Sequence, residues 1–207
     1  GSEMCIRDRS GTERPAIVMA LQICILRDIL WIVAGYEDGV LQAWTIPVST
    51  MEPTLVWTHK SHTESIMALS MSPTCDSVLS LGADYNIVRT ALHQEAVPHV
   101  QRIKRPGHAC ASVRWDERVC VLGGWDACAR VFTWPSLEPL AKLAYHKDSI
   151  YALSFVRHDA VHVLHAHLDE SSDEDAKETS ASRQLLLACG SKDGRISLWN
   201  ETFTKKP

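Results

Sequence analysis

The sequence predicts an all-β fold built from four similar antiparallel repeats, and three observations support this prediction. The stretch LLLACGSKDGRISLW, residues 185–199, indicates two strands joined by a tight turn that contains Asp193 and Gly194. The same pattern recurs in WIVAGYEDGVLQAW and CVLGGWDACARVF, and more weakly in VLSLGADYNIVRT. The turn aspartates stand at positions 38, 84, 126 and 193, spaced by 46, 42 and 67 residues, and removal of a polar insertion reduces the last spacing to about 42.

A period of about 40–45 residues with an internal hairpin is typical of WD40 β-propeller blades, each of which is a four-stranded sheet. The predicted blades cover about residues 16–60, 62–105, 108–145 and 146–200. Most strands are apolar on both faces, as sheets packed between neighbouring sheets require. The predicted strands are, in order, Ala16–Ile25, Ile29–Gly35, Val40–Ile46, Thr54–Thr58, Ile66–Met71, Asp76–Ser80, Ile87–Leu92, His99–Lys104, Ala111–Trp115, Val119–Leu122, Ala129–Trp134, Leu140–Ala144, Ile150–Val156, Gln184–Cys189 and Arg195–Trp199.

The composition is that of an ordinary soluble domain, with 45% hydrophobic and 22% charged residues among 207. The seven cysteines are scattered and include no CxxC pair, which favours free thiols in a reducing compartment. The net charge is −4, and residues 169–178 alone carry −5, so no general attraction to nucleic acid is expected. No apolar run approaches the length of a membrane span.

Two segments stand apart from the repeats. Residues 1–10, GSEMCIRDRS, have no apolar period and are interpreted as a non-native or disordered leader. The insertion at about residues 159–183 is acidic and is expected to be disordered, because it cannot bury enough apolar surface. Ser171 and Ser172 precede three acidic residues, the context that acidophilic kinases prefer, and are candidate phosphorylation sites. The alternative is a variable solvated loop with no role.

WD40 blades share a polar set: a His before the first strand, an Asp in the central turn and a Trp six residues later. Each repeat of this sequence holds only part of the set, since the Trp position is Trp44, Thr90, Phe132 or Trp199. The expected pairs are His62 with Asp84, His108 with Asp126 and His146 with Asp193, and the other members are Asp38, Trp44 and Trp199. A hydroxyl four residues before the Asp often completes the set, and these positions hold Ala34, Ser80, Leu122 and Cys189. A buried carboxylate needs a donor, which the imidazole supplies.

Ser, His and Asp together are also the composition of a hydrolase triad. A structural role is favoured because the set repeats in each unit, lacks its hydroxyl in three of them and occurs without a G-x-S-x-G motif. We therefore predict no catalytic residues and no enzyme activity.

Other site types are not supported. His158, His162, His165 and His167 form a cluster without ligands at metal-site spacing, so a polar loop is preferred to a metal site. Arg102, Lys104 and Arg105 are interpreted as a solvated sheet edge. This basic run has no interleaved aromatic residues, so no direct nucleic-acid contact is predicted. No glycine-rich phosphate loop is present, and no cofactor is predicted.

The functional expectation is an interaction scaffold whose exposed aromatic residues lie in the loop before each Asp. Trp125 and Tyr36 are the candidates for partner binding, because aromatic anchors dominate interfaces. For Trp125 the alternative is packing against a neighbouring blade. A generic reader of peptides or histone tails is the second function class, and an enzyme comes third.

The motifs GGWD-x-x-x-R-V-F-x-W, PLA-x-L-x-YHKDS and GSKD-x-R-I-S-LW, between Gly123 and Trp199, resemble one WD40 family. It comprises ASTRA-associated protein 1 of fungi and the guanine nucleotide-binding protein beta-subunit-like protein 1 of animals. The resemblance implies a seven-bladed propeller and a non-catalytic subunit of the ASTRA assembly, nuclear and also cytoplasmic. The implied partners are ASTRA subunits and the co-chaperone complex of phosphatidylinositol-3-kinase-related kinases, with a link to chromatin remodelling.

The sequence departs from that family in holding only four blades, the last without a fourth strand after Trp199. We therefore expect the C-terminal part of a longer protein, forming an open arc. Its last blade should have an unpaired outer edge, and its first blade should bare an apolar face.

Overall fold

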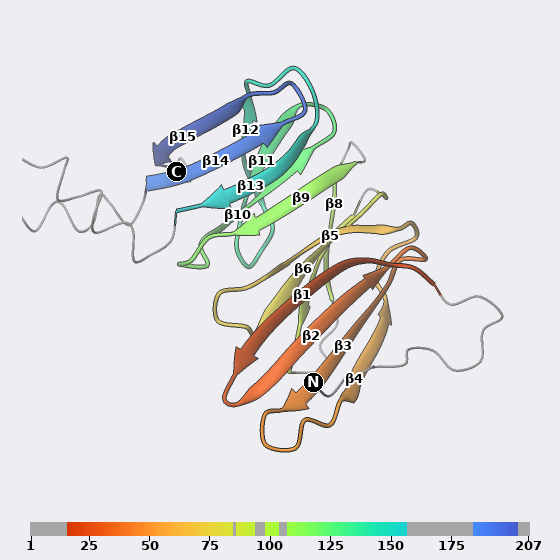
Figure 1. Ribbon diagram of the computed structural model, residues 1–207. Helices are drawn as coiled ribbons and strands as arrows, with labels where there is room; N and C mark the ends of the chain where they lie inside the picture. The colour runs from red at the N-terminus through yellow and green to blue at the C-terminus, as the bar shows by residue number, and fades with distance from the viewer. Residues whose placement is uncertain (1–15, 85, 94–97, 104–106, 157–183, 203–207) are drawn as a thin grey trace, which may run out of the picture. The chain divides into compact units, whose positions relative to one another are not determined.

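The computed structural model describes residues 16–84, 86–93, 98–103, 107–156 and 184–202. Within these ranges the chain forms fifteen strands and no helix (Figure 1). It contains no helix that is long and apolar enough to cross a membrane. The chain divides into two compact units, Gly1–Pro106 and Gly107–Pro207, and each is described by itself.

The first unit contains two antiparallel four-stranded sheets in which each strand pairs with the next along the chain. The sheet order is β1-β2-β3-β4 in one and β5-β6-β7-β8 in the other. The strands are β1 (Val18–Leu26), β2 (Ile29–Tyr36), β3 (Val40–Pro47), β4 (Thr54–Lys60), β5 (Ile66–Met71), β6 (Ser77–Gly82), β7 (Asn86–Ala91) and β8 (His99–Arg102).

The second unit contains one four-stranded sheet and one three-stranded sheet, with orders β12-β11-β10-β9 and β13-β14-β15. The strands are β9 (His108–Val113), β10 (Val119–Gly124), β11 (Cys128–Thr133), β12 (Pro139–Ala144), β13 (Ile150–Phe155), β14 (Gln184–Ser191) and β15 (Ile196–Thr202). Each predicted strand is present with ends that differ by at most three residues. Among the described residues β15 has no outer neighbour, as predicted for the last sheet.

The central turns follow the chemistry of tight hairpins. Gly39 and Gly194 follow the turn aspartates with φ of 79° and 77°, where a side chain would be strained. In the third sheet Ala127 takes this position with φ of 64°. The aspartate side chain stabilises the turn, since Asp38 Oδ1 accepts a hydrogen bond of 3.2 Å from the Val40 amide.

The core of each unit lies between its two sheets. In the first unit the buried cluster consists of Trp31, Val33, Leu41, Ala43, Trp57, Ile66, Leu69, Val78 and Leu92. In the second it consists of Val119, Val121, Ala129, Val131, Leu143, Ile150, Leu187 and Cys189. Apolar burial of this kind is the main source of stability for such stacked sheets.

A glycine three residues before the turn aspartate allows the two sheets of a unit to approach closely. A Cβ on Gly35 would lie 2.5 Å from Cγ2 of Ile66, and a Cβ on Gly123 would lie 2.8 Å from Cγ2 of Ile150. Ile66 and Ile150 both stand four residues after the His of their repeat and are fully buried. The repeat therefore fixes a matched glycine and isoleucine between neighbouring sheets.

The first sheet leaves one apolar face bare. Leu21, Ile23 and Ile25 alternate along β1 and are more than half exposed, while Cys24 between them packs on the core cluster. The sequence prediction of a bare apolar face on the first blade is thus confirmed. The last sheet has a second such face, where Ile196 and Leu198 of β15 are about four-fifths exposed (76% and 81%).

Candidate functional site

The second sheet contains a complete Ser–His–Asp network. His62 Nδ1 lies 3.0 Å from Asp84 Oδ1, and His62 Nε2 lies 2.9 Å from Ser80 Oγ. The carboxylate also accepts hydrogen bonds of 3.0 Å from the amides of Thr63 and Asn86. Asp84 therefore joins the loop before β5 to the turn between β6 and β7.

The electrostatics of this network follow from burial and from the donors around the carboxylate. Burial lowers the pKa of His62, and Asp84 only partly opposes this effect. Burial alone would raise the pKa of Asp84, but hydrogen bonds from His62, Thr63 and Asn86 hold it below its usual value. The carboxylate of Asp84 is therefore ionised, and hydrogen-bond donors of the protein replace water around it.

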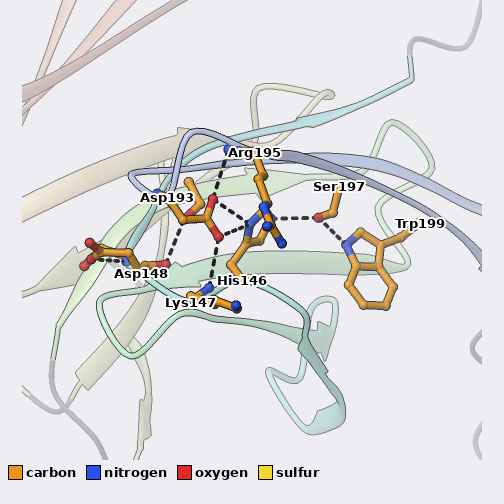
Figure 2. A network of polar contacts seen from close by, with 9 residues as sticks. His146, Lys147, Asp148, Asp193, Arg195, Ser197 and Trp199 are labelled. Atoms are coloured by element: carbon orange, nitrogen blue, oxygen red, sulfur yellow. Dashed lines mark hydrogen bonds and ion pairs between the residues drawn. The ribbon is translucent and has the colours of Figure 1, made fainter.

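The fourth repeat builds a similar network with a different hydroxyl (Figure 2). His146 Nδ1 lies 3.2 Å from Asp193 Oδ2, and His146 Nε2 lies 2.8 Å from Ser197 Oγ. The amides of Lys147 and Arg195 donate to the carboxylate at 2.9 and 3.0 Å. The first of these bonds is the largest cause that lowers the pKa of Asp193 to about 2.

Ser197 is a network member that the sequence analysis missed. It is directly opposite Cys189, the residue at the expected hydroxyl position, in the β14–β15 ladder. Trp199 Nε1 donates to the same oxygen at 2.9 Å, which ties the Trp of the repeat to the network. In this repeat the hydroxyl is therefore supplied by the facing strand of the hairpin, β15, and not by β14.

This exchange follows a rule that covers all four central hairpins. The residues four before and four after the turn aspartate face each other, and one polar side chain occupies each pair. The pairs are Ala34 with Gln42, Ser80 with Val88, Leu122 with Arg130 and Cys189 with Ser197. The register of the hairpin could have revealed the rule, because the residues that face each other follow from the turn length.

The third repeat does not form the expected pair between His108 and Asp126, so this prediction is wrong. Arg130 lies opposite Leu122 and binds the Asp126 carboxylate through two nitrogens, at 2.9 and 2.5 Å. His108 is buried, with 1% of its surface exposed, and neither ring nitrogen has a hydrogen-bond partner among the described residues. Burial, reinforced by the Arg130 charge, lowers the pKa of His108 to about 4.

The first repeat contains a different polar chain, and Tyr36 belongs to it. The Tyr36 hydroxyl donates to Gln42 Oε1 at 2.9 Å, and Gln42 Nε2 donates to Thr58 Oγ1 at 3.2 Å. Tyr36 is only 2% exposed, so the prediction that it presents an exposed ring to a partner is wrong. Its position at the end of β2 turns the ring inward, onto Ala34 and Val40. Trp44, on β3, is half-buried.

Trp125, in contrast, is 39% exposed at the turn between β10 and β11. Its ring lies over Gly107, where an added Cβ would come within 2.1 Å of the ring carbon Cε3. Its amide donates to the Gly107 carbonyl at 3.0 Å. The ring is thus held in place by its own unit and still presents a substantial surface to solvent.

Some sequence predictions concern residues outside the described ranges. These are the leader at residues 1–10, Ser171 and Ser172, the acidic insertion, the histidines from 158 to 167, Lys104 and Arg105. Within the described ranges, no group of three or more His, Cys, Asp and Glu side chains could hold a metal ion.

The sheets and their polar networks are similar to those of WD40 repeats, and the model of the family described as "WD domain, G-beta repeat" matches residues 137–200. ASTRA-associated protein 1 of Verticillium alfalfae is 29% identical over 204 residues, covering 89% of this chain and 50% of that protein. The mouse guanine nucleotide-binding protein subunit beta-like protein 1 is 27% identical and covers 96% of this chain and 53% of its own length. ASTRA-associated protein 1 of Schizosaccharomyces pombe is 27% identical over 94% of this chain and 50% of its own.

These similarities confirm the resemblance to this WD40 family that the motifs near the C-terminus indicate. The chain spans about half the length of the curated relatives it matches.

Proposed function

We propose that this chain is a non-catalytic protein-interaction scaffold that acts in an assembly of the ASTRA type. The comparisons support the coarser part of this statement, because relatives aligned over most of the chain are named ASTRA-associated protein 1 or guanine nucleotide-binding protein subunit beta-like protein 1, and a WD-repeat family matches residues 137–200. The proposed partners are ASTRA subunits and the co-chaperone complex of phosphatidylinositol-3-kinase-related kinases. The proposed location is the nucleus and also the cytoplasm, with a role in chromatin remodelling.

The observation that supports a non-catalytic role is the burial of the Ser–His–Asp sets. Ser80 is 0% exposed, and His62 and Asp84 are also buried, so a substrate carbonyl could not approach the serine oxygen. In the fourth repeat Ser197 is buried too, and its oxygen already accepts the indole N–H of Trp199. The same atoms that would activate a nucleophile in a hydrolase here join loops to strands.

A reader of histone tails is less well supported. Recognition of a basic tail needs acidic side chains or an aromatic cage. Around Asp193, the exposed side chains of the fourth repeat are mainly basic: Lys147, Lys192 and Arg195. This surface would repel a basic tail.

The test is affinity purification of the tagged chain from fission yeast, followed by mass spectrometry. We expect enrichment of ASTRA subunits and of the kinase co-chaperones over a tagged, unrelated WD40 protein. Failure to enrich any of them, from cells in which the chain is folded and soluble, would contradict the ASTRA part of the proposal.

A further inference from the structure

Three loops of the second unit are joined by a continuous series of hydrogen bonds. Ser149 Oγ donates to the Trp125 carbonyl at 3.1 Å, which ties the β12–β13 loop to the β10–β11 turn. The Lys192 amide donates to the Ser149 carbonyl at 2.9 Å, and Ser191 Oγ donates to the Asp148 carbonyl at 2.8 Å. The β14–β15 turn is therefore bound to the same loop, and the three segments form one surface.

The side chains of these segments give this surface its chemistry. We call Trp125, Lys147, Asp148, Lys192 and Arg195 the loop surface. Its members other than Asp148 are exposed, and Figure 2 shows Lys147 and Arg195 projecting beside the His146–Asp193 pair. Trp125 adds an exposed apolar ring that is fixed on Gly107.

The positive charge of the loop surface is only partly balanced within the unit. Asp193 is engaged by His146 and by two backbone amides, and Asp126 by Arg130. Asp148 lies 3.9 Å from Lys192 Nζ, a distance at which an exposed pair contributes little. The loop surface therefore carries three cations, one weakly paired carboxylate and an ordered aromatic ring.

We propose that the loop surface binds an acidic peptide segment of a partner protein, with an apolar side chain of that segment packed on Trp125. This inference rests on the proposed scaffold function and specifies the partner chemistry of one face. Charge complementarity carries it: Lys147, Lys192 and Arg195 pair with carboxylates, while the ring supplies apolar contact. Because the loops are fixed by their own hydrogen bonds, little ordering entropy is lost on binding.

The direct test uses the purified chain and a short fluorescein-labelled peptide of Asp and Glu with one central Leu, followed by fluorescence anisotropy. We expect saturable binding that weakens with added salt. The double variant Lys147→Glu/Lys192→Glu should bind about tenfold more weakly, and so should Trp125→Ala. The double variant alters only exposed side chains, so it keeps the proposal testable where Trp125→Ala fails to fold.

The matched control is Lys142→Glu, which makes the same charge change as either single variant, Lys147→Glu or Lys192→Glu, on an exposed lysine of β12 in the same unit. It should leave the affinity for the peptide within about twofold of the wild type. Equal weakening by Lys142→Glu and by the single variants Lys147→Glu and Lys192→Glu would show only general charge attraction and would overturn the proposal. So would tighter binding of a single-stranded oligonucleotide than of the peptide, or no binding of the peptide at all.

The peptide assay and the purification from yeast test the two proposals separately. Recovery of ASTRA subunits together with no peptide binding would reject the loop-surface proposal and leave the proposed function standing. Peptide binding that depends on the loop surface, without ASTRA subunits, would support this surface and reject the ASTRA assignment.

Discussion

Cys189 and Ser197 face each other across the β14–β15 hairpin, and Ser197 supplies the hydroxyl that the position of Cys189 lacks. In the second repeat the arrangement is reversed, because Ser80 supplies the hydroxyl and Val88 faces it. The network thus needs one hydroxyl at the level of the histidine Nε2, and either strand can provide it.

The Ser197→Ala variant should lower the free energy of unfolding by about 2 kcal/mol, because both His146 and Trp199 lose a buried partner. Urea denaturation measures this loss. The double variant Cys189→Ser/Ser197→Ala should recover more than half of it by restoring the hydroxyl on the opposite strand. The control is Ser154→Ala on β13, where the side chain is exposed and little change is expected.

Removal of the imidazole should change the free energy of unfolding by different amounts in the second and third repeats. His62→Leu should cost about 2–4 kcal/mol of stability, because the buried Asp84 and Ser80 side chains each lose their hydrogen bond to the imidazole. His108→Leu should change stability by less than about 1 kcal/mol or increase it, since neither ring nitrogen of His108 has a partner in the part of the chain that the structure describes. Equal destabilisation by the two variants would show that His108 has a polar role that its surroundings do not indicate.

His108 also predicts a dependence of stability on pH. Its folded pKa of about 4 lies below the usual value of 6.5, so the unfolded chain binds more protons between these values. The stability contributed by the neutral ring is therefore full above about pH 6.5 and decreases as the pH falls toward 4, by up to about 3 kcal/mol. Denaturation curves of the wild type and of His108→Leu at pH 7 and pH 4.5 measure it, and the variant should lose less stability in acid. Parallel losses in both proteins would refute this assignment.

The glycines that precede the turn aspartates predict a sharp contrast between two similar substitutions. Gly123→Ala should destabilise the second unit by about 1–3 kcal/mol, because its Cβ would lie 2.5 Å from Cys110 Sγ and 2.8 Å from an Ile150 methyl carbon. Gly190→Ala has only Ala152 Cβ within reach, at 3.4 Å, and should be neutral within about 0.5 kcal/mol. Thermal unfolding of the two variants checks the difference, and a tolerated Gly123→Ala would mean that the sheets can separate.

The sequence predicted the strands and the repeat because both follow from short-range signals. The Asp-Gly turn fixes a hairpin, and apolar residues on both faces indicate stacked sheets. The pairing of His62 with Asp84 and of His146 with Asp193 follows the same spacing. A repeated motif therefore predicts these hydrogen-bonded pairs correctly as long as each repeat keeps both partners of the pair.

The structure differs from the sequence predictions where a repeat uses another residue to pair with a buried polar group. Arg130 takes the carboxylate of Asp126, which leaves His108 without its expected partner. Tyr36 is buried and donates its hydroxyl to Gln42, whereas Trp125 remains 39% exposed. A motif defined along one strand does not predict these alternative pairings, because they depend on which residues face each other across the hairpin.

The central claim is that the networks are structural and that exposed loop residues contact partners. The most direct test is quantitative recovery of partner proteins from yeast by Ser197→Ala and by Lys147→Glu/Lys192→Glu, at a temperature where both are folded. We predict that Ser197→Ala recovers partners as the wild type does, although it is less stable, and that the loop variant recovers about tenfold less. Full recovery by the loop variant together with loss in Ser197→Ala would contradict the claim.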